Sequence, residues 1–295
     1  MQNFPVIIIG AGPAGLITAL QLKRFGIPAL CFEGGRIGGL LHNANLVENY
    51  LGFPRGISGP ALVKVFEKQA QNIGVEILFE KILSLDHDGE KFEVTTNKAK
   101  YQSQIAVVAS GTKPRTFAKG FIPAEARKRV FYEVYPLLGE QGRDILIVGA
   151  GDAAFDYALN LARENRVTIL NRGTQIRALG LLQERARKNA NIVYHEKAQV
   201  ERISLLGEGR LTVEITHRDD VEITEADFML GAIGRTPRLG FLSPNLEEKE
   251  AGLMKRGILH YVGDVKNGIY RQTAIAVGDG LRAAMKIDQI LKEHR

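Results

Sequence analysis

Two glycine fingerprints constrain what this 295-residue chain folds into. The first, Gly10-Ala11-Gly12-Pro13-Ala14-Gly15, follows the apolar run Val6 to Ile9, and the second, Gly149-Ala150-Gly151-Asp152-Ala153-Ala154, follows Ile145 to Val148. In such a turn the first glycine permits a tight bend, the second lets the backbone approach a pyrophosphate, and the small last residue lets the next helix pack on the strand. A single copy also occurs where ordinary strands end. Two copies with these flanks predict two Rossmann-like units, each with a dinucleotide site.

The strand after each fingerprint predicts which nucleotide is bound. One ends at Glu33 and the other at Asn171-Arg172, each near the distance of about 20 residues at which the ribose is read. A carboxylate at this place suits the free 2′-hydroxyl of FAD, whereas arginine suits the 2′-phosphate of NADPH. The alternative is that both side chains are solvated strand ends. We expect FAD at the first fingerprint and NADPH at the second.

Composition narrows the remaining classes. No apolar run approaches the 18 or more residues that cross a membrane, so we expect a cytoplasmic protein. Cys31 is the only cysteine of the sequence, which excludes an internal disulfide, a Cys-x-x-Cys pair and a zinc cluster. Because it lies in a predicted strand, we expect a buried structural thiol. The net charge of +6 favours acidic partners, and no basic stretch interleaved with aromatic residues indicates nucleic acid.

The order of predicted elements repeats after each fingerprint. Both repeats close with a similar segment, Ala109 to Arg115 in the first and Ala232 to Arg238 in the second, where the chain would leave one domain and return to it. We therefore expect an α/β fold of two Rossmann-like, three-layer ββα domains, the second inserted into the first. The discontinuous FAD-binding domain would comprise residues 1–112 and 239–295, and the NAD(P)H-binding domain residues 113–238.

The ordered set of motifs resembles the low-molecular-weight thioredoxin reductases and their relatives, the thioredoxin-reductase-like ferredoxin–NADP⁺ reductases. The resemblance extends over nearly the whole chain. It is carried by both fingerprints, Glu33, Val47-Glu48-Asn49-Tyr50, Ala109-Ser110-Gly111, Gly234-Arg235-Thr236-Pro237, Gly263-Asp264 and Arg271-Gln272. It implies FAD in the outer domain, NAD(P)H in the inserted one, and a homodimer.

Fingerprints and resemblance together assign the expected cofactor-binding residues. For FAD these are Gly10, Gly12, Pro13, Ala14, Gly15, Glu33, Gly39, Leu40, Leu41, Asn49, Ile82, Ala109, Gly111, Gly263, Asp264, Arg271, Gln272 and Thr273. For NAD(P)H they are Gly149, Gly151, Asp152, Ala153, Ala154, Asn171, Arg172, Arg177, Gly234 and Arg235. Among them Asn49, Asp264 and the Arg271-Thr273 segment have an alternative interpretation as turn or cap residues.

The departures from the family pattern bear on the reaction. Tyr132-Glu133-Val134-Tyr135 stands where thioredoxin reductases carry their redox Cys-x-x-Cys, so exchange through an internal dithiol is excluded. The stretch from Phe131 to Val134 instead looks like the ferredoxin reductase relatives. Leu40 stands where both relatives commonly have glutamine. Gly173 replaces the second of two arginines that the family places at the NADPH phosphate, while Arg172 and Arg177 remain, so NADH is an alternative to NADPH.

These features predict an FAD-dependent NAD(P)H oxidoreductase. Hydride would pass to the flavin, and electrons would pass on to an external acceptor, with a small acidic carrier of the ferredoxin or flavodoxin type as the favoured partner. No side chain is expected to act as an acid, a base or a nucleophile. Tyr50 and Tyr132 are candidates to stack on the flavin ring, with core packing as the alternative. Two further hypotheses are a non-catalytic flavin- or nucleotide-binding sensor or partner subunit, and a reductase of a quinone or an external disulfide.

Overall fold

The computed structural model describes residues 2–206, 209–218 and 220–293. Their contacts divide the chain into two units. Unit 1 comprises residues 1–42, 47–113 and 236–295, and unit 2 comprises residues 43–46 and 114–235. The predicted domains also include residues 1, 207, 208, 219, 294 and 295, which lie outside the described residues.

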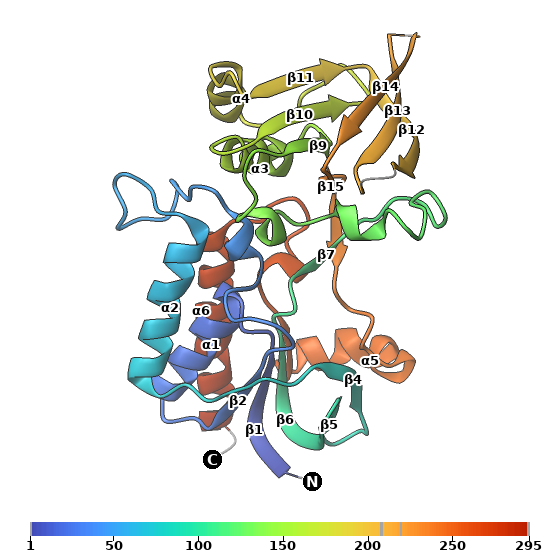
Figure 1. The fold of residues 1–295 in the computed structure, drawn as a ribbon. Helices are drawn as coiled ribbons and strands as arrows, with labels where there is room; N and C mark the ends of the chain where they lie inside the picture. The colour runs from blue at the N-terminus through green and yellow to red at the C-terminus, as the bar shows by residue number, and fades with distance from the viewer. Residues whose placement is uncertain (1, 207–208, 219, 294–295) are drawn as a thin grey trace. The chain divides into compact units, whose positions relative to one another are not determined.

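Unit 1 is built on one mixed sheet (Figure 1). Its described strands are β1 (Gln2–Ile9), β2 (Ala29–Phe32), β3 (Ile77–Leu78), β4 (Ile82–His87), β5 (Phe92–Thr96), β6 (Lys100–Val108) and β17 (Leu259–Tyr261). The strands β3-β2-β1-β6 lie in this order and are parallel, and β17 pairs parallel to the end of β6. The strands β5 and β4 extend the sheet antiparallel from the beginning of β6.

Alternate side chains of β1 enter two different cores. Val6 and Ile8 pack with the helices of one face, whereas Ile7 and Ile9 pack with β4, β5 and the helix of the other face. Because both faces are covered, β1 reads as a continuous apolar run. The helices are α1 (Pro13–Arg24), α2 (Gly59–Ile73) and α6 (Thr273–Glu293) on the first face and α5 (Pro244–Lys255) on the second.

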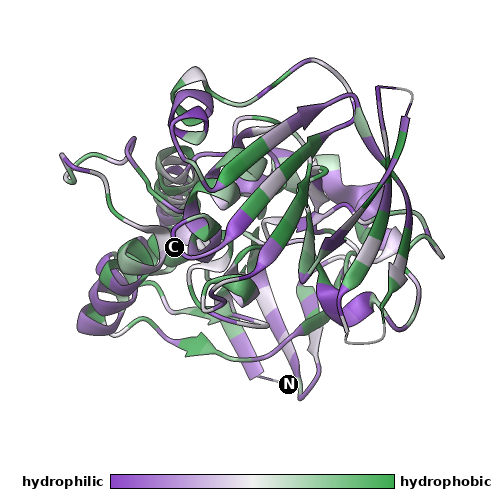
Figure 2. Ribbon diagram, turned by 45° about the horizontal axis from the view of Figure 1, so that its top comes forward, coloured by the Kyte–Doolittle hydropathy of each residue, from purple (hydrophilic) through white to green (hydrophobic). Residues whose placement is uncertain are grey.

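Unit 2 repeats the arrangement. Its sheet has the order β11-β10-β9-β15-β8, all parallel, and a separate antiparallel sheet has the order β12-β13-β14. The strands are β8 (Val130–Phe131), β9 (Asp144–Val148), β10 (Arg166–Asn171), β11 (Ile192–Glu196), β12 (Ala198–Leu205), β13 (Leu211–His217), β14 (Asp220–Ala226) and β15 (Phe228–Gly231). Helices α3 (Asp152–Leu161) and α4 (Gly180–Arg187) cover one face of the parallel sheet, and the antiparallel sheet covers the other. The apolar strands between them are green in Figure 2.

The two segments that connect the units pair with each other. They form a two-stranded sheet of β7 (Thr112–Pro114) and β16 (Arg235–Pro237). Short 3₁₀ helices occupy Gly39–Asn43, Arg127–Arg129, Tyr135–Leu137 and Gly263–Val265. The expected fold class, α/β with two Rossmann-like domains of which one is inserted into the other, is confirmed. The assignment of FAD to residues 1–112 with 239–295 and of NAD(P)H to residues 113–238 stays a proposal.

Candidate functional site

The first glycine turn has the geometry of a pyrophosphate cradle. Gly10 has a φ of +105°, and a Cβ there would lie 2.5 Å from the carbonyl oxygen of Ala109, so neither the conformation nor the space admits a side chain. A Cβ on Gly15 would collide with the carbonyl oxygen of Gly10, whereas one on Gly12 would meet nothing within 4 Å. Helix α1 begins at Pro13 without a side-chain cap, which leaves its amino end available to an anion.

Glu33 is held against this turn at the end of β2. One carboxylate oxygen accepts a hydrogen bond from the backbone N–H of Ala11 at 2.9 Å, and the other accepts one from Gly35 at 2.7 Å. Each oxygen keeps a lone pair for a ribose hydroxyl. The acid that the sequence singles out therefore lies beside the glycine turn, as a site for an adenosine with a free ribose requires.

Two further segments of unit 1 reach the same turn. The loop at Gly38 and Gly39 lies over it, since Gly38 donates to the carbonyl of Ala11 at 2.8 Å and a Cβ on Gly39 would lie 3.7 Å from the Cα of Gly12. Gly263 approaches from the other end of the chain, because its Cβ would lie 2.8 Å from that of Ala14. Predicted FAD residues from four parts of the sequence are thus brought together here, including Leu40 and Leu41 in the loop and Asp264 after Gly263.

A second group of predicted FAD residues is joined by side chains. The amide of Asn49 donates to the side-chain oxygen of Gln272 at 2.9 Å. Next to Gln272, the Nε atom of Arg271 is buried and has no hydrogen-bond partner among the described residues. A buried guanidinium nitrogen without a partner fits a segment that contacts a polar ligand. Thr273 opens helix α6 directly after these residues.

The remaining unit 1 predictions differ in their surroundings. Gly111, with a φ of +64°, follows Ala109 at the end of β6. Ile82 opens β4 and packs, partly buried, against the core of the second face of the sheet. The ring of Tyr50 packs edge-on against Phe66 with centroids 5.7 Å apart, and partial burial raises the pKa of its hydroxyl. Stacking of Tyr50 on a flavin stays a prediction.

The second glycine turn in unit 2 matches the first. Gly149 has a φ of +136°, and a Cβ there would collide with the carbonyl oxygen of Ala232. Gly151 again faces open space, and α3 again begins without a side-chain cap. Behind it, Ala154 is fully buried under the sheet, as the small last position requires. The carboxylate of Asp152, in the first turn of α3, accepts from the backbone N–H of Leu179 at 2.8 Å.

The loop after β10 is closed by Asn171. Its amide donates to the hydroxyl of Tyr194 at 2.9 Å and to the carbonyl of Gln175 at 3.2 Å, and its oxygen accepts from Gly173. The backbone of Arg177 then donates to the carbonyl of Ala150 at 2.8 Å, which folds the loop back onto the glycine turn. Arg172 and Arg177 are both exposed, so a phosphate can reach them.

The residues of the stretch that stands in place of the family's dithiol are held by contacts within unit 2. The hydroxyl of Tyr132 accepts from the backbone N–H of Phe117 at 3.1 Å, and its ring leaves no room for a side chain on Gly231. Glu133 forms an ion pair of 2.9 Å with Arg235, which follows Gly234 (φ +106°). Val134 is fully buried. These contacts fit the core-packing alternative for Tyr132; its stacking on a flavin stays a prediction.

The single cysteine is remote from such chemistry. Cys31 is fully buried in β2, its thiol lies 3.7 Å from the carbonyl oxygen of Gly10, and burial together with the charge of Glu33 raises its pKa. A thiol held protonated and inaccessible is neither a nucleophile nor a redox partner. The expectation of a buried, structural Cys31 is confirmed.

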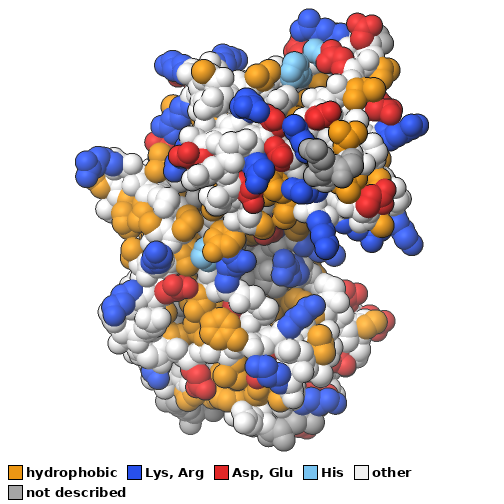
Figure 3. Space-filling view, in the orientation of Figure 1, with side chains coloured by type: hydrophobic (Ala, Val, Ile, Leu, Met, Phe, Trp, Pro, Cys, Tyr) orange, Lys and Arg blue, Asp and Glu red, His pale blue; other side chains and the backbone are white. Residues whose placement is uncertain are grey.

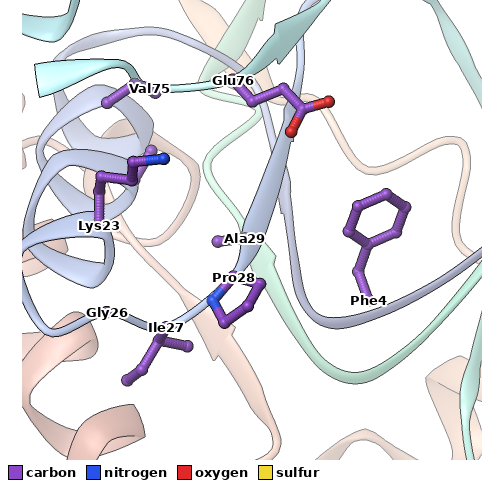
Figure 4. Close-up of a pocket in the computed structure, with 9 residues that line it drawn as sticks. Phe4, Lys23, Gly26, Ile27, Pro28, Ala29, Val75 and Glu76 are labelled. Carbon is purple, nitrogen blue, oxygen red and sulfur yellow. The ribbon is translucent and has the colours of Figure 1, made fainter.

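A shallow pocket lies at the opposite end of the unit 1 sheet (Figure 4). It is lined by Phe4 at the start of β1, by Lys23 and the turn from Gly26 to Ala29 before β2, and by Glu76 before β3. Ligands of open α/β sheets bind at the carboxyl ends of the strands, and this pocket lies at the amino ends. The glycine turns, where the sequence predicts the nucleotides, follow the carboxyl ends of β1 and β9 instead.

Sequence reasoning missed some residues that bear on these sites. Lys197 donates from its backbone to the carbonyl of Gly173 at 3.0 Å, and Asp156 on α3 accepts from Asn45 at 2.9 Å. Neither belongs to a motif. The contact of Lys197 arises from strand register, and that of Asp156 from a loop far away in the sequence. No local sequence pattern therefore predicts either contact.

Comparison with known proteins places the chain in a family. Residues 4–279 match the family described as pyridine nucleotide-disulphide oxidoreductase. The chain is 31% identical to the bifunctional thioredoxin reductase/thioredoxin of Mycobacterium leprae, with 98% of the chain and 66% of that protein covered. It is 29% identical to the thioredoxin reductase of Chlamydia pneumoniae, with 99% of the chain and 100% of that protein covered.

Solved structures agree with this placement. The crystal structure of the thioredoxin reductase of Lactococcus lactis superposes with a TM-score of 0.87 at 26% identity, covering 98% of this chain and 99% of that one. FAD and NADPH are the cofactors of this family. The chain belongs to the pyridine nucleotide-disulphide oxidoreductases, and with a single cysteine in its sequence it is a thioredoxin-reductase-like, FAD-dependent NAD(P)H oxidoreductase that lacks a redox-active disulfide of its own.

Proposed function

We propose that this enzyme passes electrons from NADPH through FAD directly to an external acceptor, a small acidic carrier of the ferredoxin or flavodoxin type. The observation that carries the proposal is the stretch from Tyr132 to Tyr135. No sulfur stands there, and Tyr132, Glu133 and Val134 are all engaged in contacts within unit 2. Since Cys31 is buried as well, the chain offers no thiol route out of the flavin.

The residues described above would hold the cofactors in this scheme. The glycine turn of unit 1, with Glu33, would hold the adenosine and pyrophosphate of FAD, and the turn of unit 2, with Arg172 and Arg177, those of NADPH. When bound, the flavin supplies hydride acceptance and electron release, which no side chain of the chain offers. The protein's contribution is binding, orientation and exclusion of water.

The preference for an acidic carrier is supported by one strongly basic loop. The segment 115–129, which we term the basic loop, carries Arg115, Lys119, Arg127, Lys128 and Arg129 against one acid, Glu125. Lys119, Arg127 and Lys128 are exposed and form no ion pair among the described residues. Figure 3 shows lysine and arginine side chains (blue) on the face of unit 2 turned to the viewer, interspersed with acidic ones (red). Exposed charge of one sign attracts a carrier of the opposite sign.

Aromatic side chains fix the basic loop on unit 2. Phe117 and Phe121 stack with ring centroids 5.3 Å apart, and the ring of Tyr132 lies 5.8 Å from that of Phe117. The contact between Phe117 and Tyr132 thus joins the basic loop to the stretch that stands in place of the dithiol. An electron carrier docked on this loop would contact the part of unit 2 in which relatives with a dithiol keep their sulfurs.

The test is stopped-flow reduction and reoxidation. Anaerobic NADPH is expected to bleach the flavin band, and a ferredoxin or flavodoxin is expected to restore it at least tenfold faster than oxygen, a quinone or an external disulfide. Cys31→Ala is the matched control and should turn over like the native enzyme. Failure of NADPH to bleach bound FAD would favour the sensor hypothesis, and faster reoxidation by a quinone or disulfide would favour the third one.

Three accompanying proposals rest on the same family relationship. We propose the FAD and NAD(P)H roles of the two domains as given above, a homodimer, and a cytoplasmic location. No helix within the described part of the chain combines the length and hydrophobicity that crossing a membrane requires.

A further inference from the structure

Two basic residues adopt a backbone conformation that disfavours them. Among the described residues other than glycine, positive φ occurs at Lys197 (50°) and Arg218 (52°). The left-handed region costs an ordinary residue about 1 kcal/mol, and Lys and Arg have no local side-chain hydrogen bond that relieves it, as Asn and Asp do. Backbone strain of this kind is often kept at ligand sites.

A chain of two hydrogen bonds links these residues to the loop after β10 that contains Arg172 and Gly173. Lys197 donates from its backbone to the carbonyl of Gly173 at 3.0 Å, and Arg218 donates to the carbonyl of Lys197 at 3.4 Å. Strand register produces this succession, since Asn171 lies opposite Glu196 in the parallel pair β10 and β11. The turn at Lys197 therefore contacts the residue that follows Arg172, and the turn at Arg218 contacts Lys197 in turn.

The basic side chains of these turns are accessible to a ligand from solvent. Arg172, Lys197 and Arg218 are all exposed, and none of them forms an ion pair within the described residues. The neighbouring acid Glu222 is already bonded to His217 at 3.2 Å, and Glu196 is only partly exposed. Burial, with the charges of His217 and Arg218, lowers the pKa of His195, so the Arg218 charge acts on the β11 end of this cluster.

We propose that Lys197, reinforced by Arg218, supplies the cation that Gly173 cannot, and that the two read the 2′-phosphate of NADPH together with Arg172. The ligand class is an adenine nucleotide that is phosphorylated at the 2′ position. A phosphate dianion is best held by two or more cations, and Lys is suited to it as a point charge. The proposal rests on the NADPH-binding role of unit 2 and not on the identity of the electron acceptor.

Lys197→Asn is the variant that separates charge from backbone. Asparagine tolerates positive φ, so this change removes the charge while it keeps or eases the turn. Lys197→Arg keeps the charge. Lys188→Asn is the control for net charge, because Lys188 follows α4 at the opposite end of β11 and is paired with Glu184.

The readout is calorimetric binding of 2′,5′-ADP and 5′-ADP at fixed ionic strength. Lys197→Asn is expected to weaken 2′,5′-ADP about tenfold and to leave 5′-ADP within twofold; adding Arg218→Asn should weaken 2′,5′-ADP further. Lys197→Arg should restore binding, and Lys188→Asn should bind like the native protein. The kcat/KM ratio of NADPH to NADH with ferricyanide as acceptor should fall in parallel.

Several results would overturn this assignment. Native affinity of Lys197→Asn for 2′,5′-ADP would do so, as would an equal loss of both ligands, which indicates a structural role. A native protein that binds 5′-ADP as tightly as 2′,5′-ADP would also do so. Because neither the ligands nor ferricyanide involve the natural acceptor, a wrong proposal about the electron carrier would leave all of these measurements unaffected.

Discussion

The carboxylate of Glu133 lies 2.9 Å from the guanidinium of Arg235, with 34% and 17% of the respective side chains exposed. This ion pair joins the stretch that replaces the family's dithiol to the segment in which the chain leaves unit 2. Tyr157 is buried nearby, and burial raises the pKa of its hydroxyl to about 12, with the Arg235 charge opposing that rise. The stretch that the resemblance aligns with a redox Cys-x-x-Cys thus contains a structural ion pair in this protein.

The Glu133–Arg235 pair is expected to stabilise unit 2 modestly. Both partners retain some water contact, so a double-mutant cycle of Glu133→Ala and Arg235→Ala should give a coupling free energy of about 1 kcal/mol. Glu133→Gln, which keeps a hydrogen-bond acceptor, should lower the free energy of unfolding less than Glu133→Ala does. Urea unfolding of the four proteins measures this. A coupling free energy indistinguishable from zero would show that the contact contributes nothing to stability.

Local patterns were sufficient to predict the fold and the two glycine turns. The apolar runs before Gly10 and Gly149 are strands buried on both faces. Gly10, Gly15 and Gly149 are constrained by backbone atoms of the turn itself or of the segment after a neighbouring strand. Glu33 could be predicted for the same reason, because a parallel sheet brings the ends of neighbouring strands to one edge.

Contacts that depend on tertiary structure could not be predicted in this way. The Nε atom of Arg271 is buried, and the backbone of Lys197 adopts a positive φ. Both features result from the packing of segments that are distant in the sequence. The segment 43–46 belongs to unit 2 although the residues around it belong to unit 1, and its composition does not indicate this. Tyr132 was open to two interpretations because a tyrosine beside a glycine-rich segment packs or stacks with the same residue pattern.

Gly10 and Gly12 should respond differently to the addition of one methyl group. Gly10→Ala places a Cβ 2.5 Å from the Ala109 oxygen at a φ of +105°, and should destabilise the protein by about 2–4 kcal/mol. Gly12→Ala meets no protein atom within 4 Å and should change apoprotein stability by less than about 0.5 kcal/mol.

Flavin titration then separates the two effects. Because we propose that the pyrophosphate of FAD approaches the backbone in the open space at Gly12, Gly12→Ala should weaken FAD at least about tenfold while the apoprotein stays folded. Fluorescence quenching of FAD and urea unfolding of the apoprotein measure the two quantities. Unchanged FAD affinity in Gly12→Ala would place the pyrophosphate elsewhere.

Asp156 should make the stability of the protein depend on pH. Burial raises the pKa of its carboxyl from 3.8 to about 6, although the backbone N–H of Asn45 and the charge of Arg163 oppose the rise. A pKa raised by folding means that the folded state holds the proton more tightly. The stability due to Asp156 is therefore present below about pH 4 and is lost as the pH rises through about 6.

Asp156→Asn keeps an acceptor for Asn45 but cannot ionise. The unfolding free energy of the native protein should fall relative to this variant by about 1–3 kcal/mol between pH 4 and pH 7 and stay level above that range. Asp88→Asn is a useful contrast, because backbone N–H groups of Lys91 and Glu90 hold the pKa of Asp88 below its usual range. The unfolding free energy of the native protein relative to Asp88→Asn should therefore rise, not fall, as the pH increases through the acidic range. A difference for Asp156→Asn that is constant with pH would contradict the assignment.

The basic loop should control recognition of an acidic carrier more than the rate of electron transfer. Reversing two exposed charges in Arg127→Glu/Lys128→Glu should raise KM for ferredoxin or flavodoxin about tenfold and leave kcat at saturation within twofold. Salt screens such attraction, so kcat/KM of the native enzyme should fall as ionic strength rises, and that of the variant should fall less steeply.

The matched control reverses two exposed lysines of α2, Lys64→Glu/Lys68→Glu, which changes the net charge of the protein by the same amount within unit 1. If attraction were a property of net charge alone, both variants would lose the carrier equally. If the basic loop is the docking surface, only the loop variant loses it, and reduction of a small neutral quinone stays the same in all three proteins because a neutral acceptor is not steered by charge. Steady-state kinetics at several ionic strengths distinguishes these outcomes.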